Sequence, residues 1–137
     1  MAERLATYEE TVTDIEESLG IVPGFLEALP EQDLVNEWPN QKRFFFGETE
    51  IDPKTRELVG LAVAAAIGCE YCRHFHREAA RLNGATEEEL SELSFLASYT
   101  TRYSAIIQAQ DYDLDTFREE TEEIGEHLRA QMATGDD

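Results

Sequence analysis

Hydrophobic positions recur at helical spacing along most of this chain. In residues 8–19, Val12, Ile15 and Leu19 fall on one face among exposed acids, which predicts an amphipathic helix. A short helix is expected at residues 25–29. Longer helical segments follow at residues 34–46, 53–67, 69–82, 86–110 and 115–132. In the first of these, an aromatic-rich segment, Pro39 either kinks one helix or separates two. No segment alternates between apolar and polar residues as a half-buried strand does, so the pattern predicts an all-α bundle of about six helices.

Two consecutive segments form the centre of the predicted fold. Asp52 and Pro53 are suited to begin a helix, because Asp caps free N–H groups and Pro needs no hydrogen-bond partner at that position. Residues 58–67 are apolar on every side, so we expect this helix to be buried throughout. Gly68 ends it, and the next helix covers about residues 69–82. A reversal at Gly68 would make these two helices a central antiparallel pair.

The flanking segments carry further local signals. Three consecutive phenylalanines, residues 44–46, cannot all face one core, so we expect at least one to point at another subunit or at a second core face. Thr86 and Glu89 have the spacing of a capping box at the start of the next helix. In the last helix, the apolar side chains expected to point inward are those of Phe117, Ile124, Leu128 and Met132.

Composition and charge narrow the class of protein. The 137 residues are expected to form a single domain, 1–137, and 42% of them are hydrophobic. Thirty acidic against 11 basic residues give a net charge of −19, which excludes nucleic acid and anionic membranes as expected partners. Only two of the bases are lysines, and this surface resembles that of halophilic proteins, in which salt screens the repulsion. A docking face for a basic partner is the alternative explanation.

The expected location is the cytoplasm. The N-terminal residues include acids and lack the apolar core of a signal peptide. The longest apolar run, residues 58–67, is shorter than the roughly 20 residues that span a bilayer. The two cysteines lie three residues apart, which is typical of a redox or metal pair in a reducing compartment.

The cysteines and a nearby histidine form the main candidate site. Cys69, Cys72 and His76 are spaced three and four residues apart, which places them on one helix face. The cysteines occupy the first turn, where free N–H groups and the helix dipole stabilise a thiolate and lower its pKa. This arrangement favours thiol–disulfide exchange. The alternatives are an inert buried pair, or half of a zinc site completed by His76 and either Glu57 or His74.

One acid, Glu57, stands in the apolar segment that precedes the cysteines. If the two helices are antiparallel, Glu57 and His76 lie about 16 and 12 Å from the turn, so a long side chain can join them. A buried carboxylate is costly unless it is paired, and His76 is the expected partner. The pair would then relay protons to Cys72. The structural alternatives are an ion pair between Glu57 and a nearby arginine, and a hydrogen-bonded core histidine at position 76.

Four residues match one spaced pattern, E-x11-C-x2-C-x3-H: Glu57, Cys69, Cys72 and His76. The pattern resembles the motif of the carboxymuconolactone decarboxylase superfamily, and within it of the alkylhydroperoxidase D (AhpD) type, over residues 21–110. The resemblance implies an AhpD-like fold, homo-trimers or homo-hexamers, and a proton relay from carboxylate and histidine to the cysteines. It also implies reduction of hydroperoxides, or recycling of a peroxiredoxin partner, with electrons from a lipoyl-type or other dithiol. Well-studied members have histidine at the position of Tyr71, which is expected here to pack or to donate a hydrogen bond.

The leading hypothesis is an AhpD-like peroxidase or disulfide oxidoreductase. Cys69 and Cys72 cycle between dithiol and disulfide, His76 acts as general base and acid, and Glu57 orients it. The helix start favours Cys69 as the attacking thiol, whereas proximity to His76 favours Cys72. The expected substrate is a hydroperoxide or a protein disulfide, with no cofactor and no metal. The alternatives are a lyase of the decarboxylase branch acting on a small lactone acid, and a non-catalytic metal-binding or redox-sensing module.

Overall fold

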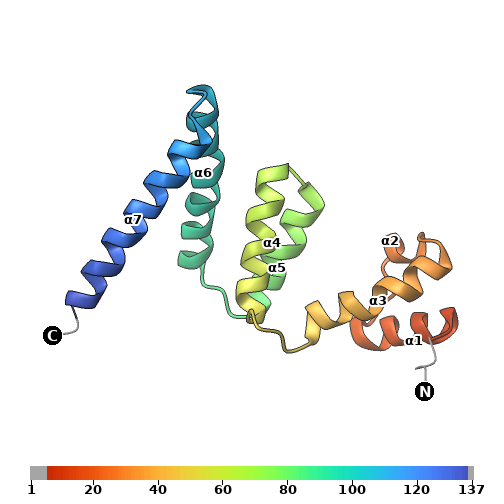
Figure 1. Cartoon of the computed structure of the whole chain (residues 1–137). Helices are drawn as coiled ribbons and strands as arrows, with labels where there is room; N and C mark the ends of the chain where they lie inside the picture. Colours follow the sequence, from red (N-terminus) through yellow and green to blue (C-terminus); the bar gives the residue numbers. More distant parts are fainter. Residues whose placement is uncertain (1–5, 136–137) are drawn as a thin grey trace, which may run out of the picture. The chain divides into compact units, whose positions relative to one another are not determined.

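The structure is a computed structural model that describes residues 6–135, and within them every regular element is a helix (Figure 1). The helices are α1 (Tyr8–Leu19), α2 (Gly24–Glu27), α3 (Glu31–Phe46), α4 (Pro53–Ile67), α5 (Glu70–Leu82), α6 (Glu87–Ala109) and α7 (Leu114–Thr134). The all-α prediction is confirmed. None of the helices within residues 6–135 combines the length and the hydrophobicity that a membrane span requires.

Contacts within the chain divide it into two compact units, which meet between Leu90 and Ser91. The first unit holds α1 to α5 and the first turn of α6, and the second holds the rest of α6 and α7. Each unit is described by itself below. The expectation of a single domain over residues 1–137 remains a prediction.

The hydrophobic core of the first unit lies among α1, α2 and α3. Its buried members are Ile15, Leu26, Leu34 and Trp38. Helix α1 has the bounds that its periodicity predicts, and its start is fixed by a capping box in which Thr7 and Glu10 each accept the other's backbone N–H. Helix α3 continues through Pro39, so the aromatic segment is one helix rather than two. Of residues 44–46, only Phe45 packs against this core, while Phe44 and Phe46 are exposed.

Helices α4 and α5 lie side by side and antiparallel, as predicted (Figure 1). The Asp52 side chain accepts the N–H of Thr55 at 3.3 Å and begins α4. Gly68 has a φ of 71°, a left-handed conformation that glycine adopts without strain, and this residue reverses the chain. Cys69 is then the N-cap of α5.

The expectation that α4 is buried throughout is wrong for the single chain. The buried residues of α4 are Glu57, Leu61 and Ala64. The exposed apolar residues on the same helix include Val59, Val63 and Ile67. An apolar helix buries only the face that another element covers, and here α5 is the main neighbour of α4.

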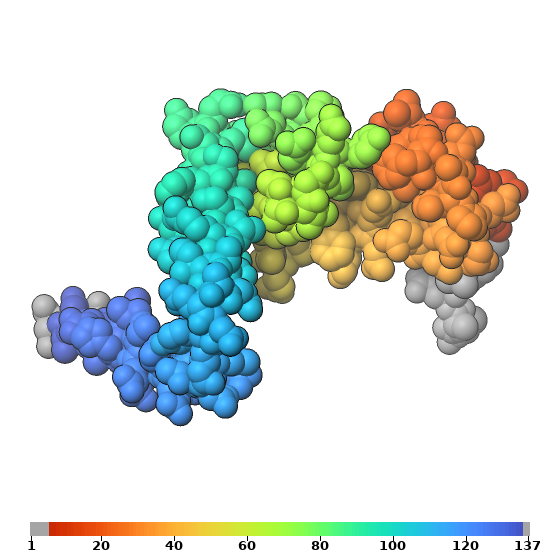
Figure 2. Space-filling view, turned by 90° about the horizontal axis from the view of Figure 1, so that it is seen from above, coloured from red at the N-terminus to blue at the C-terminus, as the bar shows by residue number. Residues whose placement is uncertain are grey.

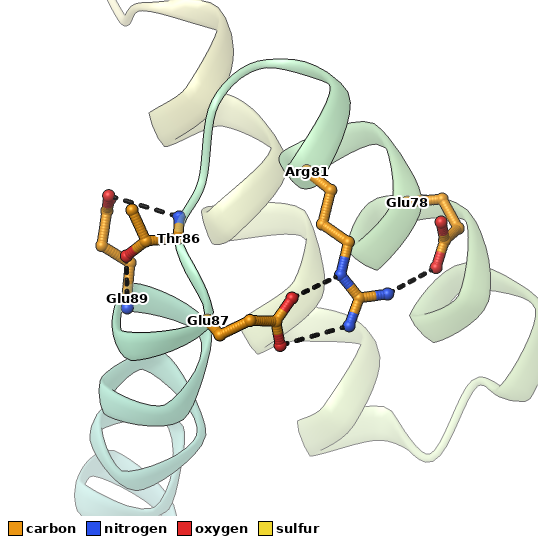
Figure 3. A network of polar contacts seen from close by, with 5 residues as sticks. All are labelled: Glu78, Arg81, Thr86, Glu87 and Glu89. Carbon is orange, nitrogen blue, oxygen red and sulfur yellow. Dashed lines mark hydrogen bonds and ion pairs between the residues drawn. The ribbon is translucent and has the colours of Figure 1, made fainter.

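Polar contacts join the end of α5 to the start of α6 (Figure 3). The predicted capping box is confirmed, because Glu89 N–H donates to Thr86 Oγ1 at 3.0 Å and Thr86 N–H donates to Glu89 Oε1 at 3.4 Å. The Arg81 guanidinium donates to Glu87 at 2.9 and 3.4 Å and to Glu78 at 2.7 Å. These bonds lower the pKa of Glu87 and raise the pKa of Arg81. The connection between the two helices is therefore held by charged hydrogen bonds.

The second unit has little buried apolar surface of its own. No described residue of α7 is buried, and the expectation that its apolar side chains point inward is wrong for the single chain. The exposed residues in question are Phe117, Ile124, Leu128 and Met132. Periodicity identifies the apolar face of a helix correctly, but it does not reveal whether the same chain covers that face.

Asp14 joins α1 to α3 and gives a testable prediction. Its carboxylate accepts the indole N–H of Trp38 at 2.7 Å and two bonds from Lys42 at 2.8 and 2.9 Å, which hold the pKa of Asp14 below its ordinary value of 3.8. A lowered folded-state pKa adds stability above pH 3.8, and this stability is lost as the pH falls through the folded-state pKa.

We expect Asp14→Asn to lower the free energy of unfolding by about 1 kcal/mol at pH 7, because the contacts are partly exposed. The difference from the parent chain should shrink as the pH falls below 3.8. Denaturant titrations followed by circular dichroism at both pH values measure this. Glu17→Gln, an exposed site on the same helix, is the control with the same charge change. Equal losses in the two variants would contradict the prediction.

Candidate functional site

The imidazole of His76 on α5 meets the carboxylate of Glu57 on α4. His76 Nδ1 lies 2.7 Å from Glu57 Oε2, with side-chain exposures of 29% and 9%, respectively. A carboxylate in its ionised form only accepts hydrogen bonds; with Glu57 in that form, the proton of this bond lies on Nδ1 and Nε2 is left for other partners. The predicted contact between these two residues is confirmed. Their roles in catalysis remain predictions.

An ion pair with a nearby arginine was one alternative for Glu57, but its neighbour Arg56 binds other groups. Its guanidinium donates to the carbonyl oxygen of Gly47 at 3.1 Å, to Thr49 Oγ1 at 3.1 Å and to the carbonyl oxygen of Arg43 at 3.4 Å. Arg56 therefore holds the loop between α3 and α4. Glu57 is paired with the histidine instead.

The two cysteines are joined at the N-terminus of α5. Cys69 and Cys72 form a disulfide with Cα atoms 5.3 Å apart. The Cys72 N–H donates to Cys69 Sγ at 3.2 Å, so Cys69 caps the helix through its sulfur. Both residues are half-buried. The pair has the spacing and placement that a reversible dithiol requires.

An aromatic pocket of about 820 Å³ opens beside Cys72 and His76. It is lined by Phe25, Glu37, Asn40, Gln41, Arg43, Phe44, Phe45, Tyr71, Cys72, Phe75 and His76. These residues come from α2, α3 and α5. In the space-filling view, the green side chains of α5 lie beside the orange-to-yellow side chains of α3, around this hollow (Figure 2). Cys72 and His76 therefore face a common space, and Cys69 and Glu57 do not line it.

Several residues of this pocket were not identified from the sequence. The consecutive phenylalanines were the available signal, but they suggested a second core or a subunit contact. Phe44 and Phe45 line the pocket, together with Phe25. The expectation that one of the three phenylalanines points at another subunit remains a prediction. Tyr71 does not pack as expected, because 88% of its surface is exposed and its ring borders the pocket.

Metal binding was one alternative for the cysteines. Within residues 6–135, no group of three or more His, Cys, Asp or Glu side chains is placed to hold a metal ion. The sulfurs bond to each other, and His76 is bonded to Glu57. Among the histidines, His74 is exposed, as expected.

Comparison with known proteins agrees with the helical fold. The crystal structure of the alkylhydroperoxidase AhpD core from Rhodospirillum rubrum is similar in fold, with a TM-score of 0.68 and 27% sequence identity. That similarity covers 85% of this chain and 95% of the other. An AhpD-like fold that carries a CxxC pair fits a thiol-dependent redox role.

Sequence comparison gives a shorter match to a curated relative, "Uncharacterized protein 4 in cox locus" from Paracoccus denitrificans. The two are 34% identical over 53 residues, which are 39% of this chain and 48% of the relative. The chain thus spans about half the length of that relative. The model of the carboxymuconolactone decarboxylase family matches residues 39–112, which are more than half of the chain and include the whole E-x11-C-x2-C-x3-H pattern. The chain therefore belongs to the carboxymuconolactone decarboxylase family.

Proposed function

We propose that the protein is a thiol-dependent oxidoreductase that reduces hydroperoxides, with Cys69 and Cys72 as its redox pair. The observation that carries the proposal is the placement of Cys72 and His76 on one pocket, with His76 held by Glu57 at 2.7 Å. The disulfide favours redox chemistry over the lyase alternative, because removal of a carboxyl group needs no dithiol. The AhpD core structure, whose name describes an alkylhydroperoxidase, supports the same reaction class.

We propose different roles for the two sulfurs because their positions differ. Cys72 lines the pocket, so we assign it the attack on the terminal oxygen of the hydroperoxide, which leaves Cys72 as a sulfenic acid and releases the alcohol. Cys69 then attacks that sulfur, which forms the disulfide and releases water. His76 accepts the thiol proton through Nε2 and returns a proton to the leaving oxygen. In sum, one hydroperoxide and two thiols give one alcohol, one water and one disulfide.

An external dithiol closes the cycle by exchange with the disulfide, which returns both cysteines to thiols. A lipoyl-type group is the donor class that the family resemblance suggests. A peroxiredoxin disulfide is the second substrate class in the proposal, since the same dithiol reduces a protein disulfide by the same exchange.

Gly60 on α4 allows His76 to occupy its position. A Cβ atom added at Gly60 would lie 2.5 Å from His76 Cε1 and Nδ1, closer than nonbonded atoms approach. The imidazole ring therefore rests directly against the helix backbone one turn after Glu57. We assign Gly60 the role of a positioning residue for the proton relay.

The apolar face of α7 supports self-assembly of the chain. Its exposed apolar residues at positions 117, 124 and 128 follow helical spacing, and none is buried within the single chain. Contiguous exposed apolar faces mark interaction sites. We propose that copies of the chain cover this face in a homo-trimer or homo-hexamer.

The proposed reaction is tested by intact mass and turnover. After reduction and removal of the reductant, one equivalent of tert-butyl hydroperoxide should lower the mass by about two units, and a dithiol should reverse the change. With excess dithiol, the chain should consume hydroperoxide catalytically, and Cys72→Ser should not. If the mass is unchanged and hydroperoxide persists, the proposal is wrong.

Removal of the imidazole should slow the thiol at neutral pH. In a Cys69→Ser background, where Cys72 is the sole thiol, His76→Ala should lower the rate of alkylation by iodoacetamide at pH 7 about tenfold, because the thiol loses its proton acceptor. His74→Ala, two residues away and exposed, is the matched control and should leave the rate unchanged. Equal rates in both variants would rule out the relay.

Gly60→Ala should displace the imidazole while favouring the helix. We expect slower alkylation of Cys72 at pH 7, and a pH profile of the alkylation rate that is shifted to higher pH. The free energy of unfolding should not fall in proportion to this loss of reactivity, because alanine is favoured over glycine in helices by about 1 kcal/mol. Gly125→Ala is the control, because its added Cβ would meet only the Arg129 side chain, at 3.2 Å or more. An unchanged pH profile in Gly60→Ala would contradict the positioning role.

The assembly surface is tested by sedimentation. We expect the parent chain to sediment as an oligomer, and Ile124→Ser combined with Leu128→Ser to shift it to smaller species, because each buried aliphatic side chain contributes about 1.5–3 kcal/mol. Glu126→Gln, on the opposite side of the same helix, should leave the oligomer intact. A parent chain that sediments as a monomer at all salt concentrations would contradict the proposal.

A further inference from the structure

Three arginines gather around the aromatic pocket, although the net charge of the chain is −19. Arg43 lines the pocket itself, and Arg73 and Arg77 line a second hollow of about 660 Å³. This second hollow, called the arginine hollow below, is formed by Phe25, Glu70, Tyr71, Arg73, His74 and Arg77. Arg73 and Arg77 are four residues apart on α5, so their side chains share one helix face.

Within residues 6–135, none of the three arginines forms an ion pair, although Arg77 is near enough to Glu87 for its charge to lower the pKa of that carboxyl. The ion pairs found there use other bases, namely Lys42, Lys54, His76, Arg81 and Arg118. Arg43 lies over the ring of Phe44, with its guanidinium carbon 4.6 Å from the ring centroid. Two acids, Glu37 and Glu70, line the hollows as well, so the arginines outnumber the acids by three to two. The guanidinium groups are therefore available for the paired hydrogen bonds that they form with carboxylates and phosphates.

The two hollows are adjacent. Phe25 and Tyr71 line both of them, so one ligand can extend across this shared edge. Its apolar body would contact the aromatic rings, its reactive group would lie at Cys72, and its anionic group would lie at Arg73 and Arg77. The aromatic pocket has a volume of about 820 Å³, within the roughly 300–1,000 Å³ typical of small-molecule sites.

We propose that this site binds an amphiphilic anion, namely a hydroperoxide with an extended apolar chain and one carboxylate or phosphate group. The proposal rests on the function proposed above and specifies its substrate class. Cys72 removes the terminal oxygen, the ligand leaves as the corresponding alcohol with its anionic group unchanged, and Cys69 closes the disulfide with release of water. The arginines orient the ligand and take no part in the bond changes.

Protection of Cys72 from alkylation tests the site without any need for turnover. In the Cys69→Ser chain, the rate of reaction with the neutral reagent iodoacetamide is measured against increasing decanoate, decyl phosphate or decanol. The ionic strength is the lowest at which the chain keeps its helix content. We expect at least one of the two anions to give half-protection at a concentration about tenfold below that of decanol. Comparison of decanoate with decyl phosphate then tells which anionic group the site prefers.

Variants connect this preference to the arginines. Arg73→Gln combined with Arg77→Gln should abolish the preference for the anions, and Arg73→Lys combined with Arg77→Lys should keep part of it. Arg118→Gln combined with Arg129→Gln on α7 makes the same change in net charge and should leave the preference intact. Equal protection by decanol and both anions, no protection by any of them, or a preference that survives the first double variant would overturn the proposal.

Turnover separates this inference from the function on which it rests. If neutral hydroperoxides are reduced but the three probes protect equally, the substrate class is wrong and the reaction stands. If the anions protect Cys72 in the expected order but no hydroperoxide is reduced by the wild-type chain, the binding site stands and the reaction is wrong.

Discussion

The hydrogen bond between Glu57 and His76 is the interaction on which the rest of the site depends. A carboxylate with 9% side-chain exposure carries a large desolvation cost, and a charged or strongly polar partner must offset it. The imidazole meets this need at 2.7 Å, and the bond fixes which ring nitrogen carries the proton. The bond also requires α4 and α5 to be antiparallel and close. Gly68 permits the reversal of the chain by its left-handed conformation, and Gly60 permits the close approach because it has no side chain.

The cysteine pair is placed so that its two sulfurs have different surroundings. Cys69 lies at the helix N-cap and accepts the Cys72 N–H, whereas Cys72 borders the aromatic pocket together with His76. A ligand in the pocket thus meets the Cys72 sulfur and the imidazole. The Cys69 sulfur does not line the pocket and is bonded to that of Cys72. Three arginines and two acids line this pocket and the arginine hollow beside it, in a chain whose net charge is −19.

Much of this arrangement could be predicted from the sequence because it depends on local signals. The bounds of α1, the cap at Asp52 and the capping box at Thr86 follow from residues a few positions apart. The contact between Glu57 and His76 could also be predicted, since one turn at Gly68 fixes the register of the two helices. The pocket could not, because Phe25, Phe44 and Phe45 meet α5 only through the packing of the first unit. The exposed faces of α4 and α7 could not be predicted either, since periodicity identifies an apolar face without revealing what covers it.

The central claim is that Glu57 acts on Cys72 through His76, and a double-mutant cycle tests it most directly. The alkylation rate of Cys72 at pH 7 is measured in the Cys69→Ser chain with Glu57→Gln, with His76→Asn and with both changes. If Glu57 works by orienting and polarising the imidazole, the double variant should be no slower than His76→Asn alone. Two effects that multiply in the double variant would show that the residues act independently, and would contradict the relay.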